Sequence, residues 1–178
     1  MTVDSRFMKI TGSGTVFVRA KIERWLLRGD TALRALIQRV KNASVSSQGR
    51  LLGRIGQGLL VFAGFTHADD GAAVQGMCEK IVRLRIFEDE AGKMNRSVVD
   101  VAGGILVVSQ FTLYGDAAKG NRPSFTDAAP PEQAEPLYQE MIACLKRLAP
   151  VPVETGSFRA EMAVALVNDG PVTILLEK

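Results

Sequence analysis

The sequence predicts a single β-rich α/β domain in which a largely antiparallel or barrel-like sheet is combined with two main helices. Three observations support this prediction. Short apolar runs separated by glycines recur in the first half of the chain, and two longer segments repeat apolar residues at helical spacing. A length of 178 residues with 47% hydrophobic residues fits one ordinary globular core and leaves no room for a second large domain.

The first strands form a predicted meander. Apolar segments at residues 35–40 and 43–47 precede a turn at 48–49, and a third strand follows at 50–55. After the glycine-rich turn at 56–58, a fully apolar run at 59–65 reads as a buried strand.

The first helix is predicted to begin after Asp69 or Asp70, because an aspartate at this position caps the free N–H groups of a helix. Helical spacing continues to about Ile86. Most of its buried face is expected to consist of Val74, Met77, Cys78, Ile81, Val82 and Leu84.

A charged turn at 88–93 and a short extended piece at 94–99 lead to an apolar strand at 105–108. The second helix opens at Pro130–Pro131, since proline is favoured in a first helical turn, and Pro150–Pro152 ends it. Two final strands, at 162–167 and 172–176, flank a Gly-Pro junction.

Charge does not identify a nucleic-acid partner. Residues 1–32 carry six basic and three acidic side chains, whereas residues 33–178 carry sixteen of each. A local basic patch remains an alternative to ordinary solvated side chains. Its members would be Arg34, Arg39, Lys41, Arg50 and Arg54.

The sequence indicates neither a metal site nor a membrane segment. One histidine and two cysteines, Cys78 and Cys144, are too few good zinc ligands, so we expect no metal or cofactor. The cysteines read as reduced core thiols. No apolar run approaches the ~18 residues of a membrane span, and the default location is the cytoplasm.

Two polar motifs follow apolar strands. Ser109–Gly115 (SQFTLYG) begins where a buried strand ends, a common position for catalytic groups, and Asn168–Thr173 (NDGPVT) places Gly170–Pro171 between two strands. The only histidine, His67, is far from Ser109 in the sequence, and a G-x-S-x-G elbow is absent. A Ser-His-Asp triad is therefore not expected.

These two motifs resemble the signatures of the D-aminoacyl-tRNA deacylase family. Four further peptides in residues 33–178 are similar to the family pattern and occur in its order, namely Gln38–Val40, Gly92–Asn95, Arg122–Phe125, and Thr155–Gly156 with Phe158 and Met162. The resemblance implies a cytoplasmic homodimer with the deacylase-family fold. Its implied activity is hydrolysis of the ester of D-aminoacyl-tRNA, and of glycyl-tRNA mischarged on tRNA(Ala).

The resemblance also implies residue roles. Ser109, Gln110, Phe111 and Thr112 would line a pocket for the 3′-terminal adenosine, with main-chain amides near the scissile carbonyl and the adenosine 2′-hydroxyl assisting hydrolysis. We expect Thr112 to position the substrate rather than attack it, since nothing in the sequence would deprotonate its hydroxyl.

The Gly170–Pro171 bond is expected to be cis and to act as a chirality filter in the partner subunit's pocket. The alternative is an ordinary trans turn. Arg39 would brace this element through a main-chain carbonyl, and Phe158 and Met162 would wall the pocket or simply pack in the core.

Residues 1–32 lie outside the resemblance. We interpret them as the product of an assigned start codon upstream of the true one, with a genuine extension as the alternative. For residues 33–178 two other functions stay open. One is a non-catalytic RNA-binding or partner-binding protein on the same scaffold, and the other is an esterase for small D-amino-acid esters.

Overall fold

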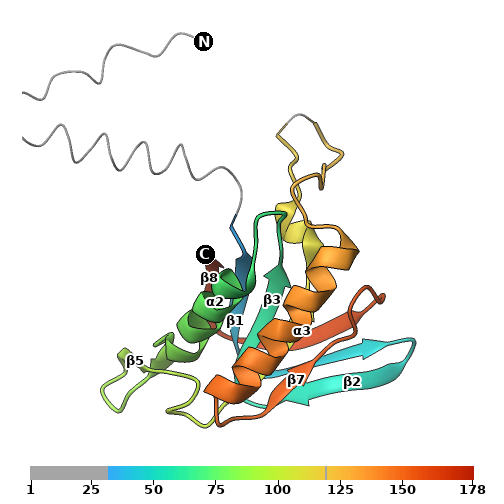
Figure 1. The fold of residues 1–178 in the computed structure, drawn as a ribbon. Helices are drawn as coiled ribbons and strands as arrows, with labels where there is room; N and C mark the ends of the chain where they lie inside the picture. Colours follow the sequence, from blue (N-terminus) through green and yellow to red (C-terminus); the bar gives the residue numbers. More distant parts are fainter. Residues whose placement is uncertain (1–31, 119) are drawn as a thin grey trace, which may run out of the picture. The chain divides into compact units, whose positions relative to one another are not determined.

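The computed structural model describes residues 32–118 and 120–178 (Figure 1). The chain divides into two units, Met1–Asp30 and Thr31–Lys178, and all that follows concerns the second. The predicted N-terminal extension therefore lies outside the described residues, apart from Ala32.

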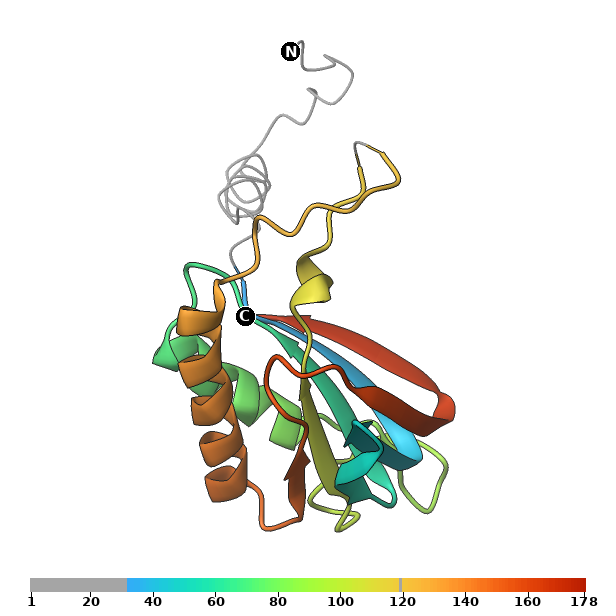
Figure 2. The ribbon, with the colours of Figure 1, turned by 90° about the vertical axis from the view of Figure 1, so that its right-hand side faces the viewer.

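One six-stranded sheet forms the centre of this unit. Its strands are β1 (Arg34–Ser47), β2 (Arg50–Ile55), β3 (Gly58–Gly64), β6 (Gly104–Ser109), β7 (Val153–Thr155) and β8 (Ala163–Glu177). They follow the order β2-β1-β3-β6-β7, and β8 also pairs with β1. Figure 2 shows the sheet strongly curved, with both long helices on one side. The predicted β-rich α/β fold with two main helices is confirmed.

The sheet is mixed rather than purely antiparallel. Strand β1 pairs antiparallel with β2, β3 and β8, as the predicted meander requires. The pairs β3–β6 and β6–β7 are parallel. Parallel neighbours need long connections, and the segments that join these strands contain the two helices.

Two pairs of predicted strands are each one longer strand. Residues 35–40 and 43–47 both belong to β1, whose register against β8 shifts between Val40 and Asn42. The exposed Lys41 and Asn42 mark this irregularity, which interrupts the pairing without ending the strand. The two predicted C-terminal strands likewise form β8, and the Gly170–Pro171 bond within β8 is cis.

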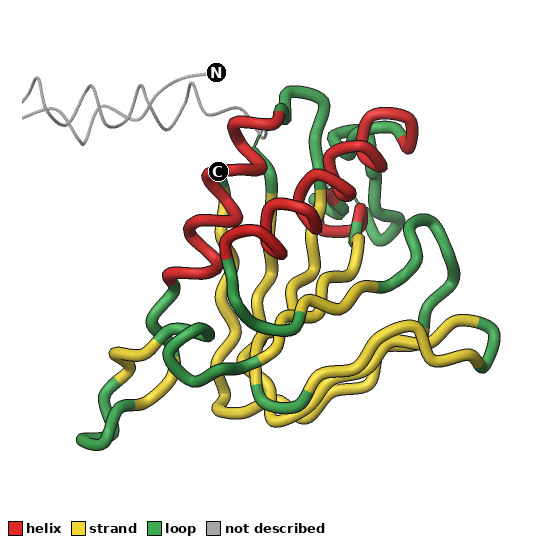
Figure 3. Tube along the Cα trace, turned by 60° about the horizontal axis from the view of Figure 1, so that its bottom comes forward, coloured by secondary structure: helices red, strands yellow, loops and turns green. Residues whose placement is uncertain are grey.

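Helices α2 (Gly71–Arg83) and α3 (Pro131–Leu148) pack side by side against the sheet (Figure 3). Asp70 is the N-cap of α2, and its carboxylate accepts the Ala73 N–H at 2.9 Å. The helix ends three residues before the predicted Ile86, because Leu84 is already extended. Neither helix is long and apolar enough to cross a membrane, as judged over the described residues.

Successive side chains of a strand point to opposite faces of the sheet, and the apolar ones form a cluster on each face. The larger cluster lies under the helices and includes Ile37, Val61, Ile81, Met141 and Leu145. The smaller cluster fills the concave side of the curved sheet and includes Val40, Val45, Leu60, Leu106 and Val108. Side chains of β8 close over this second cluster, which gives the sheet its nearly closed, barrel-like form.

The buried cysteines are neighbours across the two helices. Cys78 lies on α2 and Cys144 on α3, and both are free thiols. Burial and the nearby Cys144 thiol raise the pKa of Cys78 well above its ordinary value. Both are buried free thiols, as predicted, although their separation in the sequence conceals their proximity.

Three short elements complete the fold. β4 (Phe87–Glu88) and β5 (Met94–Arg96) form a small hairpin, and η2 (Phe111–Tyr114) is a 3-10 helix directly after β6. The sequence reasoning predicted neither η2 nor β7.

Candidate active site

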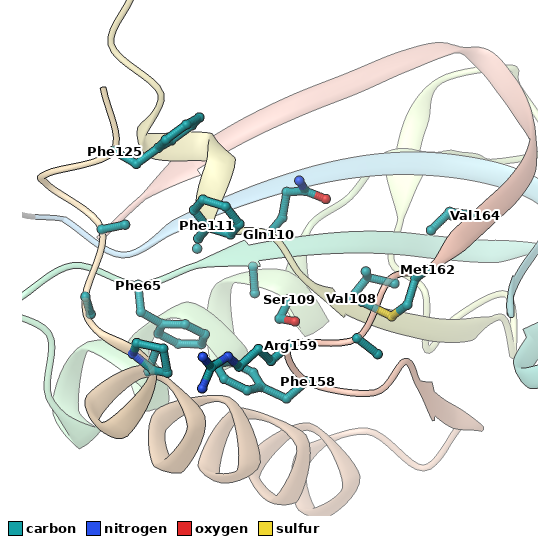
Figure 4. Close-up of a pocket in the computed structure, with 17 residues that line it drawn as sticks. Phe65, Val108, Ser109, Gln110, Phe111, Phe125, Phe158, Arg159, Met162 and Val164 are labelled. Carbon is teal, nitrogen blue, oxygen red and sulfur yellow. The ribbon is translucent and has the colours of Figure 1, made fainter. Parts of the chain in front are cut away.

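A cavity of about 570 Å³ opens where β3 and β6 end, between the start of α3 and the loop at 156–162 (Figure 4). Ligand sites commonly form outside the carboxyl ends of parallel strands, which is where this cavity lies. It is lined by Ala63, Gly64, Phe65, Val108, Ser109, Gln110, Phe111, Phe125, Ala128, Ala129, Pro131, Ala134, Phe158, Arg159, Ala160, Met162 and Val164.

The parallel pairing of β3 with β6 places the polar motif in this cavity. Ala63 is in register with Ser109, and the next residue, Gln110, donates its N–H to the Ala63 carbonyl at 2.7 Å. Because the Gln110 N–H is bonded to Ala63, it is not free to bind a ligand. The chain then enters η2, and the first N–H groups of a helix have no partner within it. In η2 these groups belong to Phe111 and Thr112.

The side chains of this segment diverge. Phe111 is 59% exposed and meets Phe125 edge-on, with ring centroids 5.2 Å apart. Gln110 donates its side-chain amide to the Thr112 hydroxyl. The Thr112 side chain is exposed and is not among the lining residues, and it contacts the cavity wall only through this bond to Gln110.

The opposite wall comes from the loop that connects β7 to β8. Val107 anchors this loop, because its carbonyl accepts both the Gly156 N–H at 3.0 Å and the Tyr138 hydroxyl at 2.9 Å. The Phe158 ring lies 5.7 Å from that of Tyr138. A Cβ atom at Gly156 would lie only 2.6 Å from the Met162 sulfur, so the glycine allows Met162 to pack there.

The cavity holds few polar side chains. Among its lining residues, only Ser109, Gln110 and Arg159 have polar side chains, and none is a histidine, cysteine or carboxylate. The exposed His67 instead places Nε2 3.0 Å from the Thr126 carbonyl. No imidazole therefore accompanies Ser109, in agreement with the prediction that a triad is absent.

Arg159 was missed by the sequence reasoning. It has a φ of +60°, which is uncommon for a residue with a side chain. Neither apolar periodicity nor a motif marks such a position, because an arginine is not a residue from which left-handed backbone is expected.

A second polar cluster surrounds Arg39, which is 6% exposed. Its Nε donates to the Asp169 carbonyl at 2.9 Å and lies 3.3 Å from the Asp169 carboxylate, while Nη1 donates to the Ile86 carbonyl at 2.5 Å. Asn168 donates its side-chain amide to the Arg39 carbonyl at 2.9 Å and to the Val172 carbonyl at 3.3 Å.

The residues on both sides of Gly170–Pro171 are thus held by hydrogen bonds, while these two residues are themselves exposed. The structure assembles Ser109, Gln110, Phe111, Phe158 and Met162 around one cavity. Arg39, Gly170 and Pro171 lie outside its lining and form the separate cluster.

Comparison with known proteins identifies the family. The model of the family described as D-Tyr-tRNA(Tyr) deacylase matches residues 36–177. The chain belongs to this family. Deacylases are hydrolases, so the chain is an enzyme of the ester-hydrolase class.

Similar proteins cover most of the chain. A D-aminoacyl-tRNA deacylase of Chloroherpeton thalassium is 59% identical over 145 residues, covering 82% of this chain and 95% of that protein. One of Thermomicrobium roseum is 58% identical, with 82% and 94% covered.

Two solved structures share the fold. The c-Myc DNA Unwinding Element Binding Protein has a TM-score of 0.77 at 43% identity, covering 82% of this chain and 98% of the other. A probable eukaryotic D-amino acid tRNA deacylase has a TM-score of 0.72 at 16% identity, covering 83% and 100%, and shows the fold alone.

Proposed function

We propose that this protein hydrolyses the ester bond of D-aminoacyl-tRNA and releases the free D-amino acid and tRNA. The observation that carries the proposal is the apolar cavity whose polar end is formed by Ser109, Gln110 and the start of η2. Its volume of about 570 Å³ lies within the range of small-molecule sites and suits an aminoacyl-adenosine.

Hydrolysis in this pocket depends on main-chain donors and on the substrate. The Gln110 N–H is bonded to Ala63, so the N–H groups of Phe111 and Thr112 are the donors proposed to stabilise the oxyanion. The lining residues include no general base, and the 2′-hydroxyl of the terminal adenosine takes part in its place. Ser109 and Thr112 position the substrate and do not form a covalent intermediate.

Selection of the D configuration is assigned to Gly170 and Pro171. These residues are exposed and do not line the cavity of their own chain, so in this proposal they enter the pocket of a second copy. Main-chain carbonyls of the element bind the substrate amine and leave no space for an L side chain. Arg39 fixes the element through the Asp169 carbonyl.

The homodimer that this arrangement requires has an apolar surface available. Val167 and Leu175, on either side of the Gly-Pro element in β8, are 48% and 52% exposed. Burial of such side chains stabilises association. The acceptor stem of the tRNA would be bound outside the cavity, and the whole reaction is assigned to the cytoplasm.

A filter that senses only configuration has two consequences. It accepts many D-amino acids, since side-chain identity is not read. It also accepts glycyl-tRNA, including tRNA(Ala) mischarged with glycine, because glycine has no L side chain to exclude. In this proposal residues 33–178 contain all of the catalytic machinery, and residues 1–32 lie outside it.

Deacylation of D-tyrosyl-, L-tyrosyl- and glycyl-tRNA by the full chain tests these proposals. We expect rapid release of D-tyrosine, measurable release of glycine and no release of L-tyrosine, with equal rates after removal of residues 1–32. Binding of tRNA without turnover would favour a non-catalytic protein on the same scaffold. Turnover of free D-tyrosine esters at a comparable rate would favour a small-molecule esterase.

A further inference from the structure

Among the described residues that line the cavity, Arg159 alone carries a charge. Its side chain is exposed, and within the described residues it has neither a hydrogen bond nor an ion pair. Figure 4 shows it on the opposite side of the pocket from Gln110 and Phe111, beside Phe158. An exposed guanidinium group thus lies beside an otherwise apolar wall.

The backbone at Arg159 adds to this observation. A φ of +60° is a conformation that glycine adopts freely and that a side chain disfavours. The position therefore carries an arginine where the backbone alone would favour glycine. Gln48 and Ala102 also have positive φ, but among these three residues Arg159 alone lines the cavity. Residues in such uncommon backbone regions cluster at active sites and ligand clamps.

The chemistry of the substrate indicates what this guanidinium binds. Near its reactive ester, aminoacyl-tRNA carries two charged groups, the α-ammonium of the amino acid and the phosphate at the 5′ position of the terminal adenosine. A guanidinium repels the ammonium and forms paired hydrogen bonds with phosphate oxygens. Because the phosphate continues into the rest of the tRNA, it must lie at the open rim, where Arg159 is located.

We propose that Arg159 binds the 5′-phosphate of the terminal adenosine and thereby orients the substrate in the pocket. This inference rests on the proposed deacylase function. It places the ester against Ser109 and Phe111 and the phosphate across the cavity, with the adenosine between them. Arg159 is in this scheme a binding residue, so it affects substrate affinity and leaves the chemical step unchanged.

Binding of a non-hydrolysable ligand tests the contact directly. The ligand is 3′-amino-3′-deoxyadenosine carrying D-tyrosine in amide linkage, prepared with and without a 5′-phosphate and measured by calorimetry. For the natural chain we expect the phosphate to strengthen binding roughly three- to tenfold, as one exposed charge-assisted contact does. In Arg159→Asn and Arg159→Gly the gain should disappear, while affinity for the unphosphorylated ligand stays the same.

The two variants remove the Arg159 charge without changing the backbone conformation at this position. Asparagine and glycine both accept left-handed backbone, so neither substitution strains the loop. Lys146→Gln is the matched control, because Lys146 is exposed in the last turn of α3 whereas the first turn lines the cavity. This control should retain the full phosphate effect.

The intact substrate provides a second measurement. For D-tyrosyl-tRNA, Arg159→Asn should raise KM roughly three- to tenfold with kcat unchanged, and the slope of log KM against log salt should fall by about 0.7, the value for one single-strand phosphate. A phosphate gain that persists in Arg159→Asn, or is absent from the natural chain, would overturn the assignment. So would a loss confined to D-aspartyl- and D-glutamyl-tRNA. Failure of the natural chain to hydrolyse D-tyrosyl-tRNA would instead reject the deacylase function itself.

Discussion

The cavity has a mostly apolar lining, whereas the Arg39 cluster is held together by polar contacts. Seventeen residues line the cavity and only three of them have polar side chains. Arg39, in contrast, is nearly buried, and its guanidinium contacts two main-chain carbonyls and two carboxylates.

The difference corresponds to two tasks. An apolar wall fits a substrate by shape and contributes affinity that does not depend on direction. A buried guanidinium with fixed hydrogen bonds instead holds main chain in one position. In the proposed enzyme, the first region binds the adenosine end of the substrate and the second keeps the chirality filter rigid. Mutations in the two regions should therefore separate binding from stereoselection.

Arg39→Ala should have the largest effect. It leaves the Asp169 and Ile86 carbonyls without their donor, so we expect the free energy of unfolding to fall by about 2–3 kcal/mol. Hydrolysis of L-tyrosyl-tRNA should appear as the Gly-Pro element loosens. Urea denaturation and deacylation of both stereoisomers measure the two effects.

Arg39→Lys is the matched control for this test, because it keeps the charge but cannot reach both carbonyls in one geometry. It should give intermediate values. Strict D selectivity in a destabilised Arg39→Ala protein would show that the cluster supports the fold and not the filter.

Gly64→Ala probes the cavity and should have a smaller effect on stability. A Cβ atom at Gly64 would lie 2.9 Å from the Gln110 carbonyl and 3.1 Å from the Tyr114 ring, so the Ser109–Phe111 segment must shift. We expect kcat/KM for D-tyrosyl-tRNA to fall about 10- to 100-fold, as for other misplaced catalytic groups. The ratio of D to L hydrolysis should not change, because Arg39 is untouched.

Gly56→Ala is the control for this substitution, since nothing lies within 4 Å of its added Cβ. Its activity should equal that of the natural chain. Loss of stereoselectivity in Gly64→Ala would mean that the two regions are not independent.

Asp89→Ala should have the smallest effect. Asp89 lies in the β4–β5 hairpin, and hydrogen bonds from the Asn95 side chain and the Lys93 N–H hold its pKa below the ordinary value of 3.8. A lowered pKa means that the carboxylate stabilises the folded state fully above 3.8 and loses this contribution as the pH falls further.

The melting temperature of Asp89→Ala should therefore be slightly lower than that of the natural chain near neutral pH, and the difference should shrink in acid. Thermal denaturation across this pH range measures it. A difference that stays constant down to low pH would contradict the assignment of the effect to the ionised carboxylate.

Local signals predicted most of the fold. The aspartate cap before α2 and the prolines at both ends of α3 act within a few residues, so their effects are readable from the chain. The register shift within β1 and the short β7 depend on pairing between distant segments, and the 3-10 helix after Ser109 is a four-residue turn without apolar periodicity. The sequence pattern carried no signal for them.

For the site, too, local motifs were predictive and the arrangement of distant segments was not. Motifs led to Ser109, Gln110 and Phe111, which the structure does place in one cavity. Arg39 and Gly170 lie outside the lining of that cavity, and their contact with each other's segments follows from how β1 and β8 pair, which local motifs do not specify. Arg159 belongs to no motif, and only its backbone conformation and position reveal it.

The long strand β8 lies at an edge of the sheet. It pairs only with β1 among the described residues, so its other edge has open main-chain groups over fifteen residues. The unpaired N–H and C=O groups of such an edge can pair with a strand of another molecule, which leads to aggregation. Pro171 has no N–H to offer a neighbouring strand and stands near the middle of that edge. The residue proposed to reject L-amino acids thus also interrupts the run of main-chain donors along β8.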